Sequence, residues 1–182
     1  MDVSVIIINY NTKQMTSECI DSVIANTDEI DYEIILVDNA STDGSKEFFE
    51  RDKRVKYIYS DSNRGFGAGN NLGVRYASGK YIFLLNSDTL LKNNAIKMLF
   101  EFSESHKSPC VCGGWLKNKD GMPNVSQIAF PRMNILEFLK SFVSKPTPDD
   151  TSSLQYIDAV CGADMFCPTR IFNQVGGFDE NI

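Results

Sequence analysis

Two aspartates stand at the ends of apolar segments, where folding can bring them together. Asp88 follows the apolar run 81–85 within a short polar tip, and Asp38 ends a second apolar run that begins at residue 32. Carboxylates accept hydrogen bonds and bind hard divalent cations. If both runs are strands of one parallel sheet, their carboxyl ends share an edge, which is where such sheets bind ligands.

The polar tip Asn86-Ser87-Asp88 also has a structural interpretation. Serine and aspartate are favoured at helix N-caps, so the tip could simply cap the next helix. The second carboxylate-bearing strand, followed by the turn-rich segment 39–45, favours a site instead. We therefore expect Asp88 to contact a ligand.

Strand and helix patterns alternate along the first half of the chain. The predicted strands are 3–8, 32–38, 55–59 and 82–85, and the predicted helices are 13–26, 44–51, 66–77 and 93–105. Such alternation is typical of an α/β fold with a largely parallel central sheet flanked by helices. Thr12 is expected to cap the first helix, whose apolar face would hold Met15, Cys19, Val23 and Ile24.

The second half of the chain is less regular. It predicts a strand at 109–116, a hairpin turn at 118–121, a helix at 133–143, a loop at 145–153, a strand at 157–161 and a helix at 168–175. The apolar stripe of 133–143 is typical of a helix packed on its own core, which we favour, or of an amphipathic element touching a membrane. Gly162-Ala163-Asp164 is predicted to be a turn.

The glycine-rich segment 63–73 resembles a dinucleotide-binding loop in composition only. In that fingerprint the loop follows the first strand, whereas here the first predicted strand is followed by Asn9-Tyr10-Asn11-Thr12. We interpret Gly65 and Gly67 as positions where the backbone passes close to a ligand. Gly73 lies within the helix predicted at 66–77 and would let that helix pack closely on the sheet.

Composition narrows the function classes further. A chain of 182 residues with 42% hydrophobic content can bury the core of a single domain. The net charge of −6 argues against a nucleic-acid surface, which needs clustered Lys and Arg, although a metal ion can still accompany phosphate in a small ligand. The five cysteines suit reduced thiols, and we expect a cytoplasmic protein, or one peripheral at the inner face of the membrane.

Several motifs occur along the chain in an order and spacing that are more specific than any one of them. They are VSVIIINYN (3–11), EIILVDNASTDGS (33–45), NRGFGAGNNLG (63–73), YIFLLNSDT (81–89), Gly162-Ala163 and GGFDE (176–180). Together they resemble family 2 inverting glycosyltransferases, most closely the bacterial rhamnosyltransferase-like branch. The resemblance implies a GT-A-type, Rossmann-like three-layer fold, a nucleotide-sugar donor such as a UDP- or dTDP-sugar, and inversion at the anomeric carbon.

The resemblance also implies roles for individual residues at the donor site. Tyr10 would lie against a pyrimidine ring, and Asp38 would hydrogen-bond the edge of that ring. Asp88 would bind Mg²⁺ or Mn²⁺ on the diphosphate, and because Asn86 replaces the first acid of the family's Asp-x-Asp-like motif, the metal would depend on Asp88 and phosphate oxygens. The remaining donor-binding positions are Asn9, Asn11, Asn63, Arg64, Gly65 and Ser87.

On the acceptor side, the resemblance matches Gly162, Ala163 and Asp164 to a segment facing donor and acceptor. The family continues beyond Gly-Gly-Phe-Asp-Glu to an acidic pair whose first member is thought to be the general base. We therefore expect the base beyond Ile182, and Asp164 is the candidate within this sequence. Binding of donor without transfer is the corresponding expectation for this chain.

The resemblance predicts a single domain over 1–182. Residues 1–106 would form the nucleotide-sugar-binding half, and 107–182 the start of an incomplete acceptor-side half. The expected acceptor is a glycan or a lipid-linked acceptor, in bacterial cell-surface polysaccharide or glycan synthesis.

Two other function classes stay open. A nucleotidyltransferase also uses a parallel sheet and an aspartate-bound metal, but it usually carries a basic glycine-rich loop after the first strand. A non-catalytic nucleotide-sugar-binding fragment would simply lack the general base. Calorimetric titration with a panel of nucleotide sugars, with and without Mn²⁺, separates these classes.

Overall fold

The computed structural model describes residues 1–124, 127–128 and 156–181. It divides into two compact units, the first formed by Met1–Cys112 with Gly162–Ile182 and the second by Gly113–Cys161. The first unit thus takes residues from both sides of the division expected at 106/107. The predicted helix 133–143 and loop 145–153 lie outside the described residues.

The first unit is built on a five-stranded sheet with the order β3-β2-β1-β4-β7. Its strands are β1 (Val3–Asn9), β2 (Tyr32–Asp38), β3 (Lys56–Tyr59), β4 (Tyr81–Asn86) and β7 (Asp164–Pro168). Strands β1 to β4 are parallel to one another, so their carboxyl ends meet at one edge. The antiparallel partner of β4 is β7. It has no counterpart among the predicted strands, because a short segment ending in proline is a weak strand signal.

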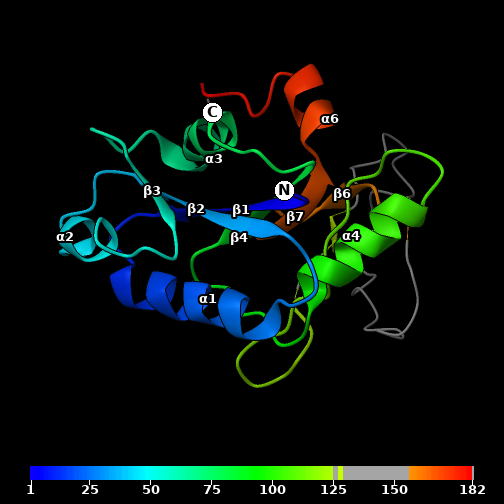
Figure 1. Ribbon diagram of the computed structural model, residues 1–182, viewed down its shortest axis with the longest axis horizontal. Helices are drawn as coiled ribbons and strands as arrows, with labels where there is room; N and C mark the ends of the chain where they lie inside the picture. Colours follow the sequence, from blue (N-terminus) through cyan, green and yellow to red (C-terminus); the bar gives the residue numbers. More distant parts are fainter. Residues whose placement is uncertain (125–126, 129–155, 182) are drawn as a thin grey trace, which may run out of the picture. The chain divides into compact units, whose positions relative to one another are not determined.

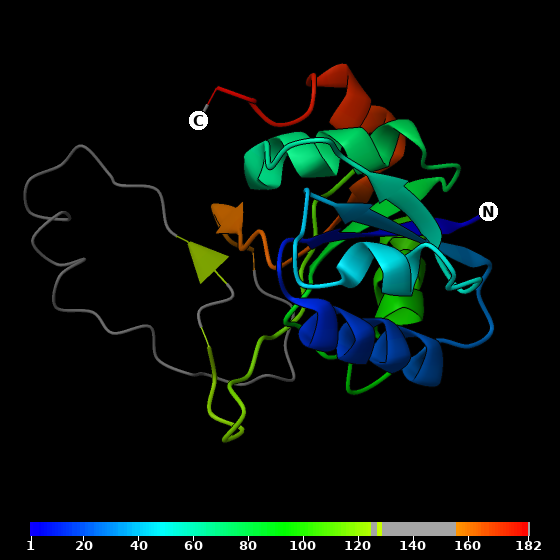
Figure 2. The same ribbon diagram turned by 90° about the vertical axis from the view of Figure 1, so that its left-hand side faces the viewer.

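Helices cover both faces of this sheet (Figures 1 and 2). One face carries α1 (Lys13–Asn26) and α4 (Ala95–Ser105), and the other carries α3 (Gly65–Arg75) and α6 (Thr169–Gln174). The short α2 (Ser45–Phe49) links β2 to β3. This arrangement is the three-layer α/β fold that the sequence predicts.

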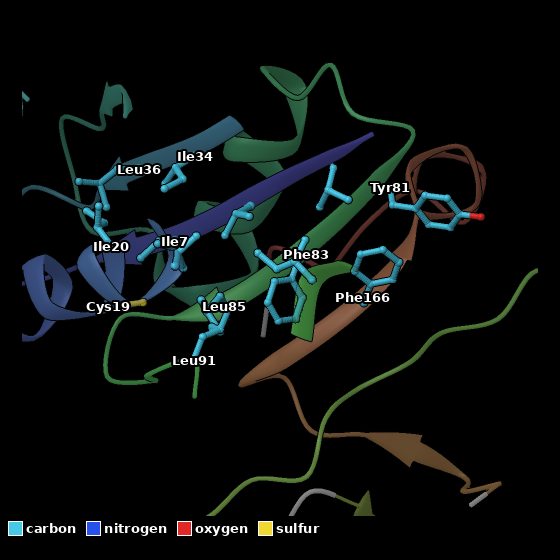
Figure 3. Close-up of a cluster of buried hydrophobic side chains, with 14 of the residues drawn as sticks. Ile7, Cys19, Ile20, Ile34, Leu36, Tyr81, Phe83, Leu85, Leu91 and Phe166 are labelled. Carbon is cyan, nitrogen blue, oxygen red and sulfur yellow. The ribbon is translucent and has the colours of Figure 1, made fainter. Parts of the chain in front are cut away.

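The side chains of β1 alternate between two apolar clusters. Ile7 belongs to the cluster under α1 and α4, whereas Ile6 belongs to the cluster under α3 and α6. Figure 3 shows Ile7 gathered with Leu85 against Cys19 and other side chains of the first cluster. A Cβ added to Gly73 of α3 would lie 2.5 Å from Cγ2 of Ile6, so the close helix–sheet packing expected at this glycine is confirmed.

The buried face of α1 differs from the predicted one. Its buried residues are Thr16, Cys19, Ile20 and Val23, whereas Met15 and Ile24 are 45% and 39% exposed. The buried face is therefore rotated from the predicted one: it includes Ile20 and the polar Thr16 in place of Met15 and Ile24. The hydroxyl of Thr16 donates to Oδ1 of Asn9 at 2.9 Å, which allows this side chain to be buried.

The first helix is capped by a residue from another loop. Thr12 occupies the N-cap position but makes no side-chain capping bond, because its hydroxyl donates to Oδ1 of Asn9 at 2.9 Å. Asp43 instead accepts the backbone N–H of Lys13 at 3.0 Å and that of Ser45 at 3.1 Å. One carboxylate therefore joins the starts of α1 and α2, which carry two of the loops at the carboxyl edge of the sheet.

Replacing Asp43 by Ala should lower the free energy of unfolding by about 1–2 kcal/mol, the usual effect of losing an N-cap. Burial raises the pKa of Asp43, but hydrogen bonds from Ser45 and Lys13 outweigh it and hold the pKa below the ordinary 3.8. A depressed folded-state pKa gives stabilisation that is complete above the unfolded-state pKa and is lost as the pH falls through the folded-state value. Urea titrations of both proteins over acid pH test this. A stability difference that does not narrow at low pH would contradict capping by the carboxylate.

The segment 109–116 forms less structure than predicted. Within this fully described segment, the β contact is an isolated bridge between Cys112 and Phe166 rather than a strand. The predicted turn at 118–121 is confirmed in the second unit, where the N–H of Asn118 donates to the carbonyl of Met122 at 2.8 Å and Gly121 has φ 83°. That unit also pairs β5 (Gln127–Ile128) with β6 (Ala159–Val160). No helix among the described residues is long and apolar enough to cross a membrane.

Candidate functional site

A cavity of about 340 Å³ lies at the carboxyl edge of the parallel strands. Its walls come from the ends of β1, β2 and β4 with the loops that follow them, from α1 and from the start of α3. The lining residues are Ile8, Tyr10, Thr12, Met15, Asn39, Asn63, Gly65, Phe66, Asn86, Ser87 and Asp88. The structure thus brings together Tyr10, Asn63, Gly65 and the whole Asn86-Ser87-Asp88 tip, which are among the expected donor-binding positions.

Asp88 lies exposed in the turn after β4, on the cavity wall. The next helix, α4, begins at Ala95 and has Asn94 as its N-cap. The interpretation of the tip as a helix cap is therefore wrong.

Neighbouring loops hold this turn in place. The hydroxyl oxygens of Thr12 and Ser87 are 3.2 Å apart, which joins the loop after β1 to the turn after β4. From the other side, the backbone N–H of Asn86 donates to the carbonyl of Ala163 at 2.9 Å. The carboxylate of Asp88 is thus presented by a turn that is fixed at its base.

The donor atoms around Asp88 fit a cation that is shared with a ligand. The part of the chain that the structure describes holds no group of three or more His, Cys, Asp and Glu side chains suited to a metal. Mg²⁺ does not need such a group, because it usually binds one or two carboxylates together with substrate phosphates and water. Asp88 could supply the carboxylate of such an arrangement.

Asn9 and Asn11 brace the loop that presents Tyr10 and do not themselves line the cavity. Asn9 is buried, and its Nδ2 donates to Oγ of Ser41 at 2.9 Å. Asn11 adopts φ 56°, a region that asparagine tolerates better than most residues, and its Oδ1 accepts the N–H of Thr42 at 2.7 Å. Tyr10, between these braces, remains 48% exposed.

At the end of β2, the cavity is lined by Asn39 and not by Asp38. Asp38 is fully buried, and its carboxylate accepts the backbone N–H of Ser41 and the hydroxyl of Tyr57, each at 2.9 Å. Burial and this hydrogen bond raise the pKa of Tyr57. The amide of Asn39 donates to the carbonyl of Gly65 at 3.1 Å, which fixes its orientation. Its Oδ1 is buried with no hydrogen-bond partner among the described residues.

An unpaired buried acceptor is unfavourable by about 1–3 kcal/mol, so a ligand that donates a hydrogen bond to Asn39 would relieve it. Asn39 is not among the residues predicted from the sequence, because the carboxylate at the strand end, Asp38, is the stronger chemical signal. The position of Asn39 in the sequence could have indicated it. Asp38 still belongs to a buried strand, whereas Asn39 is the first residue after that strand. Ile8, Thr12, Met15 and Phe66 were also missed as lining residues, since only their place in the fold brings them to the cavity.

The predicted turn at 162–164 is shorter than expected. Asp164 is the first residue of β7, where it pairs with Leu85 of β4, and it is only 5% exposed. Gly162 and Ala163 form the turn. A Cβ added to Gly162 would lie 3.5 Å from the ring of Phe66, so this turn contacts the cavity wall, whereas Asp164 does not line the cavity.

Arg64 stands between two lining residues, Asn63 and Gly65, at the start of α3. Gly65 has φ 80°, which favours glycine, and its N–H donates to Oδ1 of Asn63 at 2.9 Å. The guanidinium of Arg64 pairs with Glu180 at 2.5 Å. Of the predicted donor-binding residues, Asn9, Asn11, Asp38 and Arg64 therefore lie beside the cavity rather than in its lining.

Known proteins resemble this chain in sequence or in fold. The chain is 32% identical over 117 residues to glycosyltransferase GlyG of Streptococcus pneumoniae serotype 4, a match that covers 62% of this chain and 38% of GlyG. The structure of S. aureus TarS 1–349 in complex with UDP matches all of this chain and 51% of TarS 1–349, with a TM-score of 0.69 and 20% identity.

A second solved structure, mannosyltransferase PcManGT from Pyrobaculum calidifontis in complex with GDP-Man and Mn²⁺, matches 99% of this chain and 48% of that one, with a TM-score of 0.66 and 20% identity. The chain therefore spans about half the length of these two structures. At such identities the likeness establishes the fold, which is of the GT-A type. The sequence profile described as Glycosyl transferase family 2 matches residues 4–158. Because this match covers most of the chain, the protein belongs to glycosyl transferase family 2.

Proposed function

We propose that this protein binds the nucleoside diphosphate part of a nucleotide sugar in the cavity, and that transfer of the sugar to an acceptor hydroxyl is the reaction which this binding serves. The observation that best supports this proposal is that Tyr10, Asn39 and Asp88 line one cavity. An aromatic ring can stack on a base, an unpaired acceptor can receive an N–H or O–H, and a carboxylate can hold a cation on a diphosphate. Together these three side chains could contact the base, the N–H or O–H donors and the cation-bound diphosphate of a nucleotide ligand.

We assign contact with the base or ribose to Asn39, in place of the role that the motifs suggest for Asp38. Both oxygens of Asp38 already accept hydrogen bonds within the protein, whereas Oδ1 of Asn39 has no partner among the described residues. Uracil and thymine each present a ring N–H to such an acceptor, as guanine also does and adenine does not. The choice of a UDP- or dTDP-sugar is supported by the family resemblance. TarS is seen with UDP and PcManGT with GDP-Man, so this fold accommodates either kind of base.

The chemistry follows from the bonds exchanged. The bond between the anomeric carbon and the diphosphate oxygen breaks, a bond to the acceptor oxygen forms, and the acceptor proton passes to a general base. A bound Mg²⁺ or Mn²⁺ would neutralise charge on the departing diphosphate. Inversion, a glycan or lipid-linked acceptor and a cytoplasmic location complete the proposal, and they are supported by the family resemblance.

Calorimetric titration of the native protein with UDP, dTDP, GDP and ADP, with and without Mn²⁺, tests the binding step. Tighter binding of UDP or dTDP than of ADP is expected. Equal affinity for all four, or no binding, would contradict the proposal. Transfer itself is tested by incubating the intact protein with a bound nucleotide sugar and hydroxyl acceptors, and inversion by the anomeric configuration of the product.

Replacing Asn39 by Ala should weaken binding of the preferred nucleotide by about 1–2 kcal/mol, which is roughly 5- to 30-fold, because the ligand loses its acceptor. Asn39→Asp keeps an acceptor oxygen and should retain more affinity. Asn26→Ala is a matched control, since Asn26 also donates to backbone carbonyls but does not line the cavity. Equal weakening by Asn26→Ala and Asn39→Ala would show a general structural effect and not ligand contact.

A further inference from the structure

The chain that follows α6 runs alongside α3 (Figures 1 and 2). The side chain of Asn71, on α3, pairs with the backbone of this segment: Nδ2 of Asn71 donates to the carbonyl of Phe178, and the N–H of Phe178 donates to Oδ1 of Asn71, each at 2.9 Å. The asparagine thus pairs with both backbone groups of one residue, as a neighbouring strand would.

Packing fixes the same segment from two further directions. The ring of Phe178 lies 5.8 Å from that of Phe66 and 5.5 Å from that of Phe172, measured between centroids. Gly67 allows the approach, because a Cβ there would lie 3.1 Å from Cβ of Phe178. Gly177 adopts φ 76°, which favours glycine. The course of residues 176–180 is therefore closely determined.

This course delivers the carboxylate of Glu180 to Arg64, at the edge of the cavity. Oε2 of Glu180 lies 2.5 Å from Nη2 of Arg64, and Oε1 lies 3.1 Å from Nδ2 of Asn71 and 3.6 Å from Nη2 of Arg75. The hydrogen bond from Asn71 lowers the pKa of Glu180, and the charges of Arg64 and Arg75 lower it further, so Glu180 is anionic at neutral pH.

The side chains of Arg64 and Glu180 are 50% and 28% exposed. Ion pairs with this much exposure contribute little to stability, so a stabilising role does not explain the Arg64–Glu180 pair well. Orientation explains it better. A guanidinium has five N–H donors, and one bond to Glu180 leaves others for a second anion. An arginine ordered before its ligand arrives binds more tightly, because less conformational entropy is lost on binding.

We propose that Glu180 is a positioning residue for the donor, holding Arg64 where its guanidinium meets the diphosphate. Asn71 orients the carboxylate of Glu180, and the packed segment 176–180 sets its distance from α3. The GGFDE motif is thereby part of the donor site, although none of its residues lines the cavity. This inference rests on the proposed function, since it requires a nucleoside diphosphate as ligand.

The test compares each diphosphate with its nucleoside, using UDP with uridine, dTDP with thymidine and GDP with guanosine in calorimetric titrations of the intact protein. Glu180→Gln removes the charge but keeps an oxygen for Asn71. It should weaken the preferred diphosphate about tenfold and leave the matching nucleoside unchanged. In an Arg64→Ala background the same substitution should have no further effect, because the residue that it positions is absent. Glu180→Asp should recover part of the lost affinity.

Glu104→Gln is the matched control, since Glu104 pairs with Lys80 outside the cavity, and it should leave all affinities unchanged. Equal weakening of diphosphate and nucleoside by Glu180→Gln would indicate a purely structural role and overturn the inference. Unchanged or tighter diphosphate binding would also overturn it, the latter because Glu180 would then compete with the donor for Arg64. A native protein that prefers no diphosphate to its nucleoside would instead refute the proposed function itself.

Discussion

Replacing Asp88 by Asn should abolish the dependence of nucleotide binding on Mg²⁺ or Mn²⁺ while leaving the melting temperature nearly unchanged. The side chain of Asp88 is exposed and caps no helix, so the neutral amide of asparagine should preserve the structure equally well. The cation, in contrast, needs the anionic oxygen. Loss of residues that merely support a metal ligand lowers metal affinity by about 10- to 100-fold, so loss of the ligand should reach at least about 100-fold.

The measurement is calorimetric titration with the preferred nucleoside diphosphate over a range of Mn²⁺ concentrations. Asp61→Asn serves as the control, because Asp61 is also exposed but does not line the cavity, and its metal dependence should match that of the native protein. If Asp88→Asn retains metal-dependent binding and melts at a lower temperature, Asp88 is a structural residue and the cation binds elsewhere.

Replacing Gly79 by Ala should have the largest effect on stability among the substitutions considered. A Cβ at this buried position would lie 2.4 Å from the backbone nitrogen of Ser4, 2.7 Å from the carbonyl carbon of Val3 and 2.8 Å from the carbonyl oxygen of Tyr81. These are backbone atoms of two paired central strands, which cannot move aside as a flexible side chain can. The substitution therefore forces the start of β4 away from β1.

Overpacking typically destabilises by about 1–3 kcal/mol, and we expect the upper end of this range because the collisions involve backbone. For a chain of this size, that lowers the melting temperature by about 6–12 °C. Gly162→Ala is the matched control, since its added Cβ would make ordinary contacts at 3.5 Å, and it should change stability by less than about 0.5 kcal/mol. Thermal and urea unfolding measure both variants, and equal stability of the two would contradict the packing argument.

The sequence by itself determined the elements that depend on neighbouring residues. The helix Lys13–Asn26 and the strand Tyr32–Asp38 have the predicted bounds, because apolar periodicity and turn residues at their ends are local properties. The tip that carries Asp88 was also predicted, since it follows directly from the end of a buried strand in a parallel sheet.

Only the tertiary structure decided which polar groups face the cavity and which hold its walls. The choice between Asp38 and Asn39 depends on Tyr57, which occupies the carboxylate from the neighbouring strand. The strand β7 exists through its pairing with β4, about 80 residues earlier in the chain. Asp43 caps α1 because the loop after β2 lies beside the start of that helix. Glu180 pairs with Arg64 although the two residues are far apart in the sequence. Each of these contacts joins residues far apart in sequence. The local sequence pattern cannot indicate which distant group becomes the partner.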